Sequence, residues 1–448
     1  MKVLKFGGTS VQFSKNMKQV LSIISNYPGE ELLIVLSACR GTTDNLIKLA
    51  DAALQNNSEA TKNLLQEICS HHYTLIDSLE MDTEYKSMAI AKVSILLSEL
   101  RNIVEGISLL RELTLRSRSA VLAFGELLST AIFSVYAIAS GLEAELMDAR
   151  KIMIIDHDGF QSTVDFDETQ AAVNSKLMPI YSSGKRIVIT QGFIGSDAKG
   201  HTAVLSRGGS DYSASVFAGA VRADEIQIWT DVSGVFSADP RYYTNARTIR
   251  DMTFAEVREL SFFGAKVLHP DTVKPAIENS IPVRVLNTHL PNDLGTLLSN
   301  SPQTLSPYLS AVVMLKGLYS SELIIPTDYK SNEFLAMLGR LLDASAGKTY
   351  IVSANAGKVK IISDTEVNSD FLGELEAKVV GGIAVICLVG NNLITNISAK
   401  LFSEITAIIS EYPIEYFAFS ADESINIAVP DAIADELYTK LHEYIVQE

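Results

Sequence analysis

Cysteine is scarce in this sequence, and its placement argues against two common uses of the residue. Three cysteines occur among 448 residues, far apart and never as a C-x-x-C pair: Cys39, Cys69 and Cys387. This spacing favours free thiols in a reducing compartment over a disulfide framework or a zinc site. Histidine adds no metal signal, since His71, His72 and His157 have no second ligand at a metal-binding spacing. We expect solvated or capping histidines and no dedicated metal site.

Positive charge is also in short supply. Lys and Arg number 37 against 53 Asp and Glu, which gives a net charge of −16, and no basic run of five or more residues offsets it. Such a balance repels nucleic acid and anionic membranes. The expected partners are therefore small molecules or other protein chains, with neither nucleic acid nor membrane among them.

Long apolar runs and targeting signals are lacking as well. No apolar stretch approaches the roughly 20 residues that a membrane helix needs. The first eight residues, MKVLKFGG, have neither the apolar core of a signal peptide nor the Arg- and Ser-rich composition of a transit peptide. We expect a soluble protein in the cytoplasm.

What is present is an alternation of short apolar runs with helical patterns over the first ~290 residues. Strands are expected at Val3–Phe6, Leu32–Ser37, Arg186–Gln191, Ile226–Thr230 and Val283–Leu286. Strands that alternate with amphipathic helices predict an α/β fold, with a largely parallel sheet covered on both faces. Residues 44–119 hold no convincing strand and are expected to form a helical insertion.

The texture changes at residues 291–307, where Pro, Asn, Ser and Gly cluster. We interpret residues 293–305 as a linker between a catalytic domain, 1–292, and a tail, 306–448. The tail contains two passages of similar build, with helices expected at residues 334–342 and 400–409. This repetition indicates a duplicated small α/β module.

The segment KFGGTSV (residues 5–11) is a strand that ends in two glycines before a helix. Gly7 and Gly8 at that junction let backbone N–H groups approach an anion, and the helix N-terminus adds a favourable dipole. Lys5 supplies a full positive charge beside them. A plain structural turn remains an equal alternative for this segment alone, and neither the Walker A pattern nor G-x-G-x-x-G occurs.

A second glycine pair lies in SRGGSDYSA (residues 206–214), and it is more specific. Arg207 precedes Gly208 and Gly209, and Asp211 follows them. Arginine can bind a carboxylate through two parallel hydrogen bonds, and the aspartate can orient other charged groups or a metal–phosphate array.

Four further segments carry polar or charged residues where a site could form. Ser37 and Thr43 in LSACRGTT (36–43) follow a buried strand, where open α/β sheets bind ligands. Glu126 in FGELLS (124–129) opens a helix, although the helix macrodipole alone could explain a carboxylate there. WTDVSGVFSADPR (229–241) places acidic residues and an arginine on a loop after a strand, and FGAKVLHP (263–270) adds Lys266. The occurrence of all these segments in one α/β unit makes coincidence a poor explanation.

Taken in order, KFGGTSV, FGE, SRGGSDYSAS, WTDVSGVFSADPR and FGAKVLHP resemble the signature segments of the aspartokinases, within the amino-acid kinase fold family. The tail resembles the paired ACT regulatory modules of that family. The resemblance implies a parallel-rich sheet sandwiched by helices, followed by two ferredoxin-like α+β modules. In that arrangement the first module, 318–380, is inserted within the second, 306–317 plus 381–448.

The resemblance implies an enzyme that phosphorylates the side-chain carboxylate of aspartate with ATP, in the biosynthesis of lysine, threonine and methionine. Arg207, with Gly208 and Gly209, would bind the α-carboxylate of aspartate, and Glu126 its α-ammonium group. Ser37 and Thr43 would line the pocket around the β-carboxylate.

The resemblance also assigns the phosphate side. The amides of the Gly7–Gly8 turn would hold the transferring phosphate, and the catalytic residues would be Lys5, Asp211 and Lys266. The nucleotide would be held by these lysines and by Thr230, Asp231, Phe236, Asp239 and Arg241. Mg²⁺ would arrive with the nucleotide rather than in a protein cage.

Some residues depart from the family pattern. Phe236 stands where tyrosine is common, and Glu333 where glycine is usual; residues 344–349 also lack the typical strand entry. The last two changes fall where lysine-sensitive relatives bind their effector, so lysine or threonine is an expected effector whose response these changes could alter. We expect a homodimer formed through the ACT modules.

Two alternatives remain at this point. One is an amino-acid kinase that acts on a different small carboxylate, which Arg207 and Glu126 argue against because they suit a free α-amino acid. The other is a non-catalytic amino-acid sensor, which the presence of Lys5, Asp211 and Lys266 argues against. A fusion to homoserine dehydrogenase is not expected, since the chain ends at Glu448.

Overall fold

The computed structural model describes most of the chain, in two compact units. The described residues are 1–158, 161–206, 208–265, 268, 270–301, 309–324, 336–339, 342, 347–355, 357–367, 377–396 and 399–447. The first unit comprises residues 1–235 and 269–300, and the second comprises 236–268 and 301–448.

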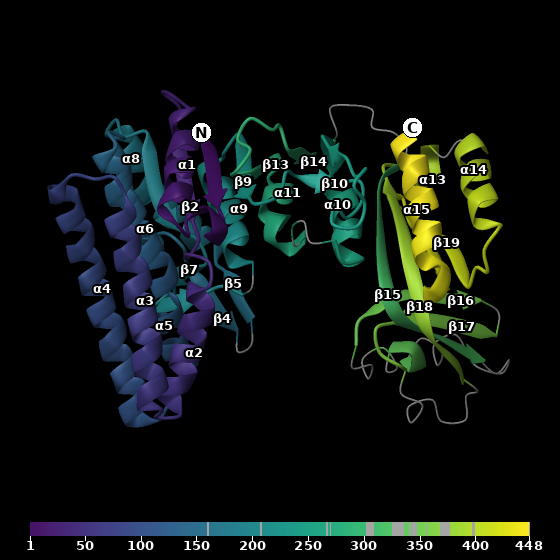
Figure 1. Ribbon diagram of the computed structural model, residues 1–448, viewed down its shortest axis with the longest axis horizontal. Coiled ribbons are helices and arrows are strands. Elements are labelled where there is room, and N and C mark those ends of the chain that lie inside the picture. The colour runs from purple at the N-terminus through teal and green to yellow at the C-terminus, as the bar shows by residue number, and fades with distance from the viewer. Residues whose placement is uncertain are drawn as a thin grey trace. The chain divides into compact units, whose positions relative to one another are not determined.

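A mostly parallel sheet forms the centre of the first unit (Figure 1). In spatial order its strands are β14 (Thr296–Ser299), β13 (Val283–Asn287), β9 (Glu225–Thr230), β1 (Lys2–Phe6), β2 (Leu32–Leu36), β6 (Ile187–Gln191) and β3 (Ala144–Met147). The five strands expected from the sequence are all present, and the expected α/β class is confirmed. Their runs of apolar residues are buried on both faces, which is typical of parallel strands.

Register brings the ends of these parallel strands to one edge of the sheet. Phe6 at the end of β1 lies opposite Leu36 of β2 and Trp229 of β9. Leu36 in turn lies opposite Gln191 at the end of β6. The segments that follow these four strands therefore begin side by side, at the edge where ligands bind in open α/β sheets.

Helices cover the sheet and form the expected insertion. They are α1 (Ser14–Ser25), α2 (Thr42–Leu54), α3 (Ser58–Ser78), α4 (Thr83–Leu110), α5 (Leu115–Leu122), α6 (Phe124–Ala139), α7 (Phe166–Ala172), α8 (Met178–Ser182), α9 (Gly209–Val221) and α11 (Lys274–Glu278). Residues 44–119 contain no strand, and α2, α3 and α4 lie side by side (Figure 1). Short strands complete this unit: β4 (Ile155–Asp158), β5 (Gln161–Val164), β7 (Ile194–Ser196) and β8 (Thr202–Val204).

One expectation about apolar runs is wrong. The continuous stretch Leu115–Ala139, formed by α5 and α6, is long and apolar enough to cross a membrane. However, 94% of its most apolar window is buried inside the protein. Packing against α4 and the sheet buries the apolar surface of α6, as is typical of a core helix.

The segment expected to be a linker contains a strand. Thr296–Ser299 forms β14, antiparallel to β13, and Leu297 and Leu298 are buried. The cluster of Pro, Asn and Gly before it makes the hairpin turn. Gly295 has φ +61°, and a Cβ there would lie 1.9 Å from the carbonyl oxygen of Val285, so only glycine fits.

The second unit is built on an antiparallel sheet. In spatial order its strands are β16 (Thr349–Asn355), β17 (Lys358–Ser363), β15 (Leu309–Ile324), β18 (Ala377–Gly390), β20 (Ser424–Pro430) and β19 (Tyr416–Ala421). Helices α14 (Ala399–Ile409) and α15 (Asp431–Gln447) pack on it, which confirms the helix expected at 400–409. The remaining elements are β10 (Val235–Phe236), β11 (Thr248–Ile249), β12 (Asp251–Thr253), α10 (Phe254–Phe262) and α13 (Leu393–Asn396).

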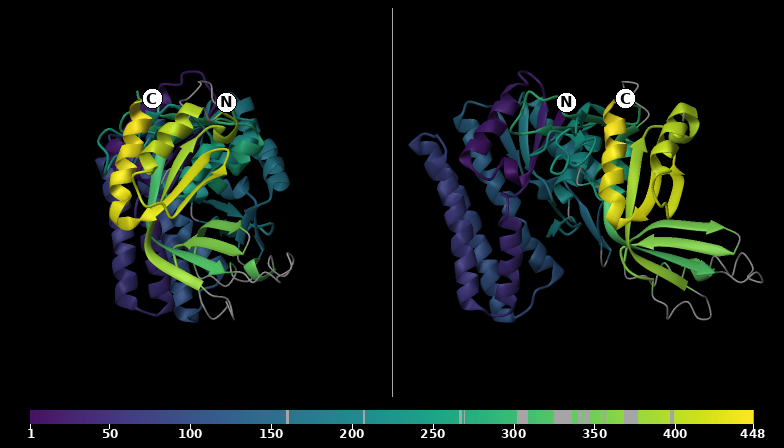
Figure 2. Two further views of the ribbon diagram at one scale, coloured as in Figure 1. Left: turned by 90° about the vertical axis from the view of Figure 1, so that its right-hand side faces the viewer. Right: turned by 45° about the vertical axis from the view of Figure 1, so that its right-hand side comes forward.

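Two long strands run through both halves of this sheet (Figure 2). β15 and β18 pair along their length, with a break in register between Leu315 and Leu318. Gly317 and Gly382 have φ near +73° and +72° at this break. On one side of the break, residues 383–389 of β18 pair with β20. On the other side, residues 319–324 of β15 pair with β17. The break lies beside the module boundaries expected at 317/318 and 380/381.

Candidate active site

A cavity of about 650 Å³ opens at the edge of the first unit's sheet where the parallel strands end. Loops after β1 and β2 and the first turns of α2, α6 and α9 line it. Eight residues expected at the site from the sequence share this lining: Lys5, Gly8, Ser37, Thr43, Glu126, Gly208, Gly209 and Asp211. Segments more than 200 residues apart in the sequence thus meet because the strand ends are aligned.

Lys5 and Asp211 form an ion pair in this cavity. Lys5 Nζ lies 2.6 Å from Asp211 Oδ1, and the lysine is only 8% exposed. β1 carries the lysine and the first turn of α9 carries the aspartate, so the pair ties a strand end to a helix N-terminus. A cation held in place by a carboxylate on a fixed helix is preorganised to meet an incoming anion.

Glu126 is the least ordinary residue of the cavity. Its carboxylate is 3% exposed; Oε1 accepts a hydrogen bond from Ala38 N at 3.1 Å, while Oε2 has no hydrogen-bond partner among the described residues. Burial raises the pKa of this carboxyl to about 8, although the Ala38 amide acts in the opposite direction. A buried carboxylate with a vacant oxygen suits a cationic ligand group, because such a group would supply the missing partner.

Close packing holds the walls of the cavity together. A Cβ on Gly8 would lie 2.7 Å from Ala38 O, and a Cβ on Gly125 would lie 2.8 Å from the Ala38 side chain. Gly7 donates its N–H to Trp229 O at 3.1 Å, so this amide is engaged in the sheet. Of the two amides expected to hold a phosphate, the amide of Gly7 already donates within the sheet, which leaves that role to Gly8.

Two helices start at the cavity without a side-chain cap. Gly41 and Gly208 are the N-cap residues of α2 and α9, and no side chain accepts a hydrogen bond from either first turn at the cap. The positive dipole ends of two helices therefore face the same space. In their first turns, the N–H groups of Thr42, Gly209 and Asp211 already donate to backbone carbonyls. Together with Lys5 they make the cavity suitable for anionic groups.

The residues expected around the nucleotide fall into both units. Thr230 and Asp231, at the exposed end of β9 in the first unit, are joined by a 3.2 Å hydrogen bond from Thr230 Oγ1 to Asp231 Oδ1. In the second unit, Arg241 donates to both carboxylate oxygens of Asp239, and Phe236 is half-buried. Arg207 and Lys266 lie outside the described residues.

The sequence analysis missed several residues that shape the cavity. Ala38 supplies the backbone amide that holds Glu126, and Phe193, Val204 and Leu205 form an apolar wall. Phe193 follows β6 closely, and its N–H donates to Ser213 Oγ on α9. Its position just after a buried parallel strand was the available signal, but an apolar residue in a loop gives no chemical indication of a site.

A parallel sheet covered by helices, with a lysine and two helix N-termini at its carboxyl edge, suits a protein that binds a small anionic molecule. The amino acid kinase family model matches residues 1–287, and the chain belongs to this family. Within it the chain belongs to the aspartokinases, because aspartokinase 1 of Arabidopsis thaliana chloroplasts is 32% identical over 409 residues, 87% of this chain and 70% of that protein.

Solved structures of Escherichia coli aspartokinase III agree over the full length. One, in complex with aspartate and ADP, is 28% identical with a TM-score of 0.78. Another, in complex with lysine and aspartate, is 28% identical with a TM-score of 0.82. Each covers 99% of both chains. The fold class expected from the sequence is therefore confirmed.

The buried carboxyl of Glu126 predicts an unusual dependence of stability on pH. Its pKa is raised from 4.5 to about 8 in the folded protein, so folding retains a proton that the unfolded chain releases above pH 4.5. Stability should fall as pH rises from about 4.5 to about 8 for this group. Glu126→Gln removes the effect, and its melting temperature should exceed that of the wild type increasingly from pH 5 to 8.

The control is Glu143→Gln, which changes an exposed glutamate between the end of α6 and the start of β3. Melting curves of the three proteins over pH 5–8, without ligand, make the measurement. A difference between Glu126→Gln and wild type that stays constant over this range would contradict the raised pKa.

Proposed function

We propose that this chain is an aspartate kinase, which transfers the γ-phosphoryl group of ATP to the side-chain carboxylate of L-aspartate. The products are ADP and 4-phospho-L-aspartate, which begins the route to lysine, threonine and methionine. One observation carries the assignment of the acceptor: a buried glutamate with a vacant oxygen shares one cavity with a fixed lysine and two helix N-termini. A cation receptor next to an anion receptor matches a free amino acid that carries a second acidic group.

The amino-acid end of the substrate would lie at Glu126. Its Oε2 would accept hydrogen bonds from the α-ammonium group, and the positive charge would bring the carboxyl to its ionised form. Arg207, which precedes the Gly208–Gly209 turn in the sequence, would bind the α-carboxylate. Ser37 and Thr43 would then flank the β-carboxylate, close to Lys5.

The reaction needs no general base, because the acceptor is already a carboxylate at neutral pH. Catalysis would consist of in-line positioning and of neutralising charge on the moving phosphoryl group. Lys5, held by Asp211, and the positive dipole end of α9 would stabilise the phosphoryl oxygens. Gly8 would bring backbone N–H groups close to the same oxygens.

The resemblance to aspartokinases assigns six further residues to the nucleotide. Thr230 and Asp231 would contact it from the end of β9, with Phe236, Asp239 and Arg241 from the following loop and Lys266 on the phosphates. Mg²⁺ would enter with the nucleotide, and Asp211 lies where a carboxylate could orient that array. The E. coli relative is solved with aspartate and ADP, which supports this pair of substrates.

The direct test is ADP release with aspartate, with glutamate and with no acceptor. Aspartate should give turnover well above the other two, because one extra methylene would move the reacting carboxylate past Lys5. Glu126→Gln should raise the KM for aspartate about 30–1000-fold, equivalent to roughly 2–4 kcal/mol, with little change in the KM for ATP. Equal turnover with glutamate, or with no acceptor, would rule out the proposal.

Lys5→Ala should lower kcat by about 10²–10³ with a small effect on folding. The matched control is Lys2→Ala, three residues earlier on the same strand, where the lysine pairs with Glu30 at the surface. Lys2→Ala should retain wild-type kcat. If Lys5→Ala also kept wild-type kcat at normal stability, the phosphate-holding role of Lys5 would be wrong.

We further propose that the second unit makes the enzyme a homodimer and binds an amino-acid effector, with lysine the first candidate. Strands β16 and β19 lie at the edges of its sheet, and unpaired edges favour association between chains. The E. coli relative is solved with lysine bound, which supports the choice. Glu333 lies outside the described residues. Light scattering and initial rates with and without lysine or threonine test this; a monomer would exclude the interface.

A further inference from the structure

Three side chains with metal-binding atoms meet beside the candidate active site. Cys39 lies in the loop after β2, and His71 and His72 lie on α3. One ligand atom from each, the cysteine sulfur and a ring nitrogen of both histidines, lies within 4.8 Å of the others. The loop and the helix are about thirty residues apart in sequence, so no spacing pattern could reveal this group.

His72 is arranged as a metal-ligating histidine usually is. It is 0% exposed, and its Nδ1 lies 2.7 Å from Ile68 O, one turn earlier on α3. A carbonyl can only accept, so Nδ1 carries the proton and Nε2 carries the lone pair. Nε2 is buried with no hydrogen-bond partner among the described residues. A backbone carbonyl that accepts the Nδ1 proton, and so fixes the tautomer, is typical of histidines that bind metals.

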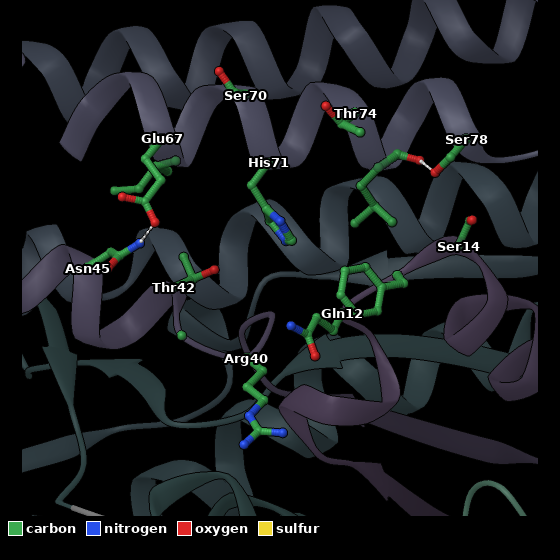
Figure 3. Close-up of a pocket in the computed structure, with 14 residues that line it drawn as sticks. Gln12, Ser14, Arg40, Thr42, Asn45, Glu67, Ser70, His71, Thr74 and Ser78 are labelled. Carbon is green, nitrogen blue, oxygen red and sulfur yellow. Dashed lines mark hydrogen bonds between the residues drawn. The ribbon is translucent and has the colours of Figure 1, made fainter. Parts of the chain in front are cut away.

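His71 connects the group to solvent. It lines a second cavity, of about 760 Å³, between the start of α1, the start of α2 and α3. Figure 3 shows its ring pointing from α3 into that cavity, with Thr42 and Gln12 on either side. His71 Nε2 also has no hydrogen-bond partner among the described residues. The cavity gives an ion a path in and leaves room for a water as a fourth ligand.

Cys39 completes the set from the loop after β2, where it lines the candidate active-site cavity. Its thiol is buried and donates to Val11 O at 3.2 Å. Burial raises the pKa of this thiol to about 12, so without a metal it stays a neutral donor. A bound divalent cation would displace the thiol proton into solvent and form a metal–thiolate bond, as coordination does elsewhere.

We propose that Cys39, His71 and His72 bind a zinc ion that ties the loop after β2 to α3. One thiolate and two imidazoles, with an open fourth position, suit Zn²⁺ better than Mg²⁺ or Ca²⁺. With Zn–S near ~2.3 Å and Zn–N near ~2.0 Å, tetrahedral ligand atoms lie about 3.3–3.6 Å apart. The three ligand atoms lie within 4.8 Å of one another, so they must close by at most about 1.5 Å.

The same loop connects this site to the candidate active site. Cys39, Arg40 and Gly41 line the candidate active-site cavity of about 650 Å³. Arg40 and Gly41 line the second cavity as well. An ion on Cys39 would fix the conformation of a wall that both cavities share. The binding claim itself does not depend on the kinase reaction, and its test uses no activity.

Cobalt(II) substitution tests the ligands directly. The full chain, stripped of metal, should bind one Co²⁺ and show a thiolate-to-cobalt charge-transfer band that stoichiometric Zn²⁺ removes. The matched pair is Cys39→Ser and Cys69→Ser, since Cys69 lies on α3 two residues before His71 but is not part of the group. Cys39→Ser should abolish the band, and Cys69→Ser should leave it unchanged. A band kept in Cys39→Ser, or absent from the wild type, would overturn the proposal.

Zinc affinity and melting temperature give a second readout. His71→Gln, on the cavity wall, should weaken Zn²⁺ binding by more than the ~10–100-fold typical of losing an outer-shell partner. Zn²⁺ should raise the melting temperature of the wild type and Cys69→Ser but not of Cys39→Ser. Because His72→Gln changes a fully buried side chain, it is used only if it keeps the wild-type circular dichroism. Equal Zn²⁺ affinity in His71→Gln and wild type would overturn the proposed ligand set.

Discussion

Glu126 sits in the interior of the first unit with one carboxylate oxygen on the Ala38 amide and the other without a partner. Burying a carboxyl group in this way is costly, and the cost explains why its pKa rises to about 8. A ligand that brings a positive charge would reduce that cost, so binding of a cationic group at Glu126 becomes more favourable. Gly8 and Gly125 pack closely against Ala38, the residue whose amide binds the carboxylate, so that a Cβ on either glycine would clash with it.

The rest of the site follows from the alignment of parallel strand ends. Lys5 lies on β1, and the Gly7–Gly8 turn follows that strand. Ser37 and the start of α2 follow β2, and Thr230 and Asp231 lie at the end of β9, which is aligned with the end of β1. Asp211 on α9 pairs with Lys5, so the lysine is held in place without a ligand. Glu126 and Lys5 thus line one cavity, and in the proposed function an aspartate molecule would lie between them.

Much of this could be predicted from the sequence, because periodicity and glycine placement are local signals. The five strands, the helical insertion and the glycine turns were read from residues that are neighbours in the chain. Three features could not be. The hairpin turn before Thr296 has the composition of a linker; the stretch Leu115–Ala139 is apolar enough for a membrane helix, and only the fold shows that it is buried; and the Cys39–His71–His72 group depends on tertiary contact. The lack of a hydrogen-bond partner for Glu126 Oε2 among the described residues likewise depends on tertiary contacts and could not be predicted from the sequence.

Proton release on aspartate binding tests the central role of Glu126 most directly. Calorimetric titrations at pH 7, in two buffers that differ in ionisation enthalpy, give the number of protons released. Because the free carboxyl has a pKa of about 8 and the bound ammonium would hold it ionised, binding should release close to one proton in the wild type and none in Glu126→Gln. Tight aspartate binding by the wild type with no proton release would contradict the account.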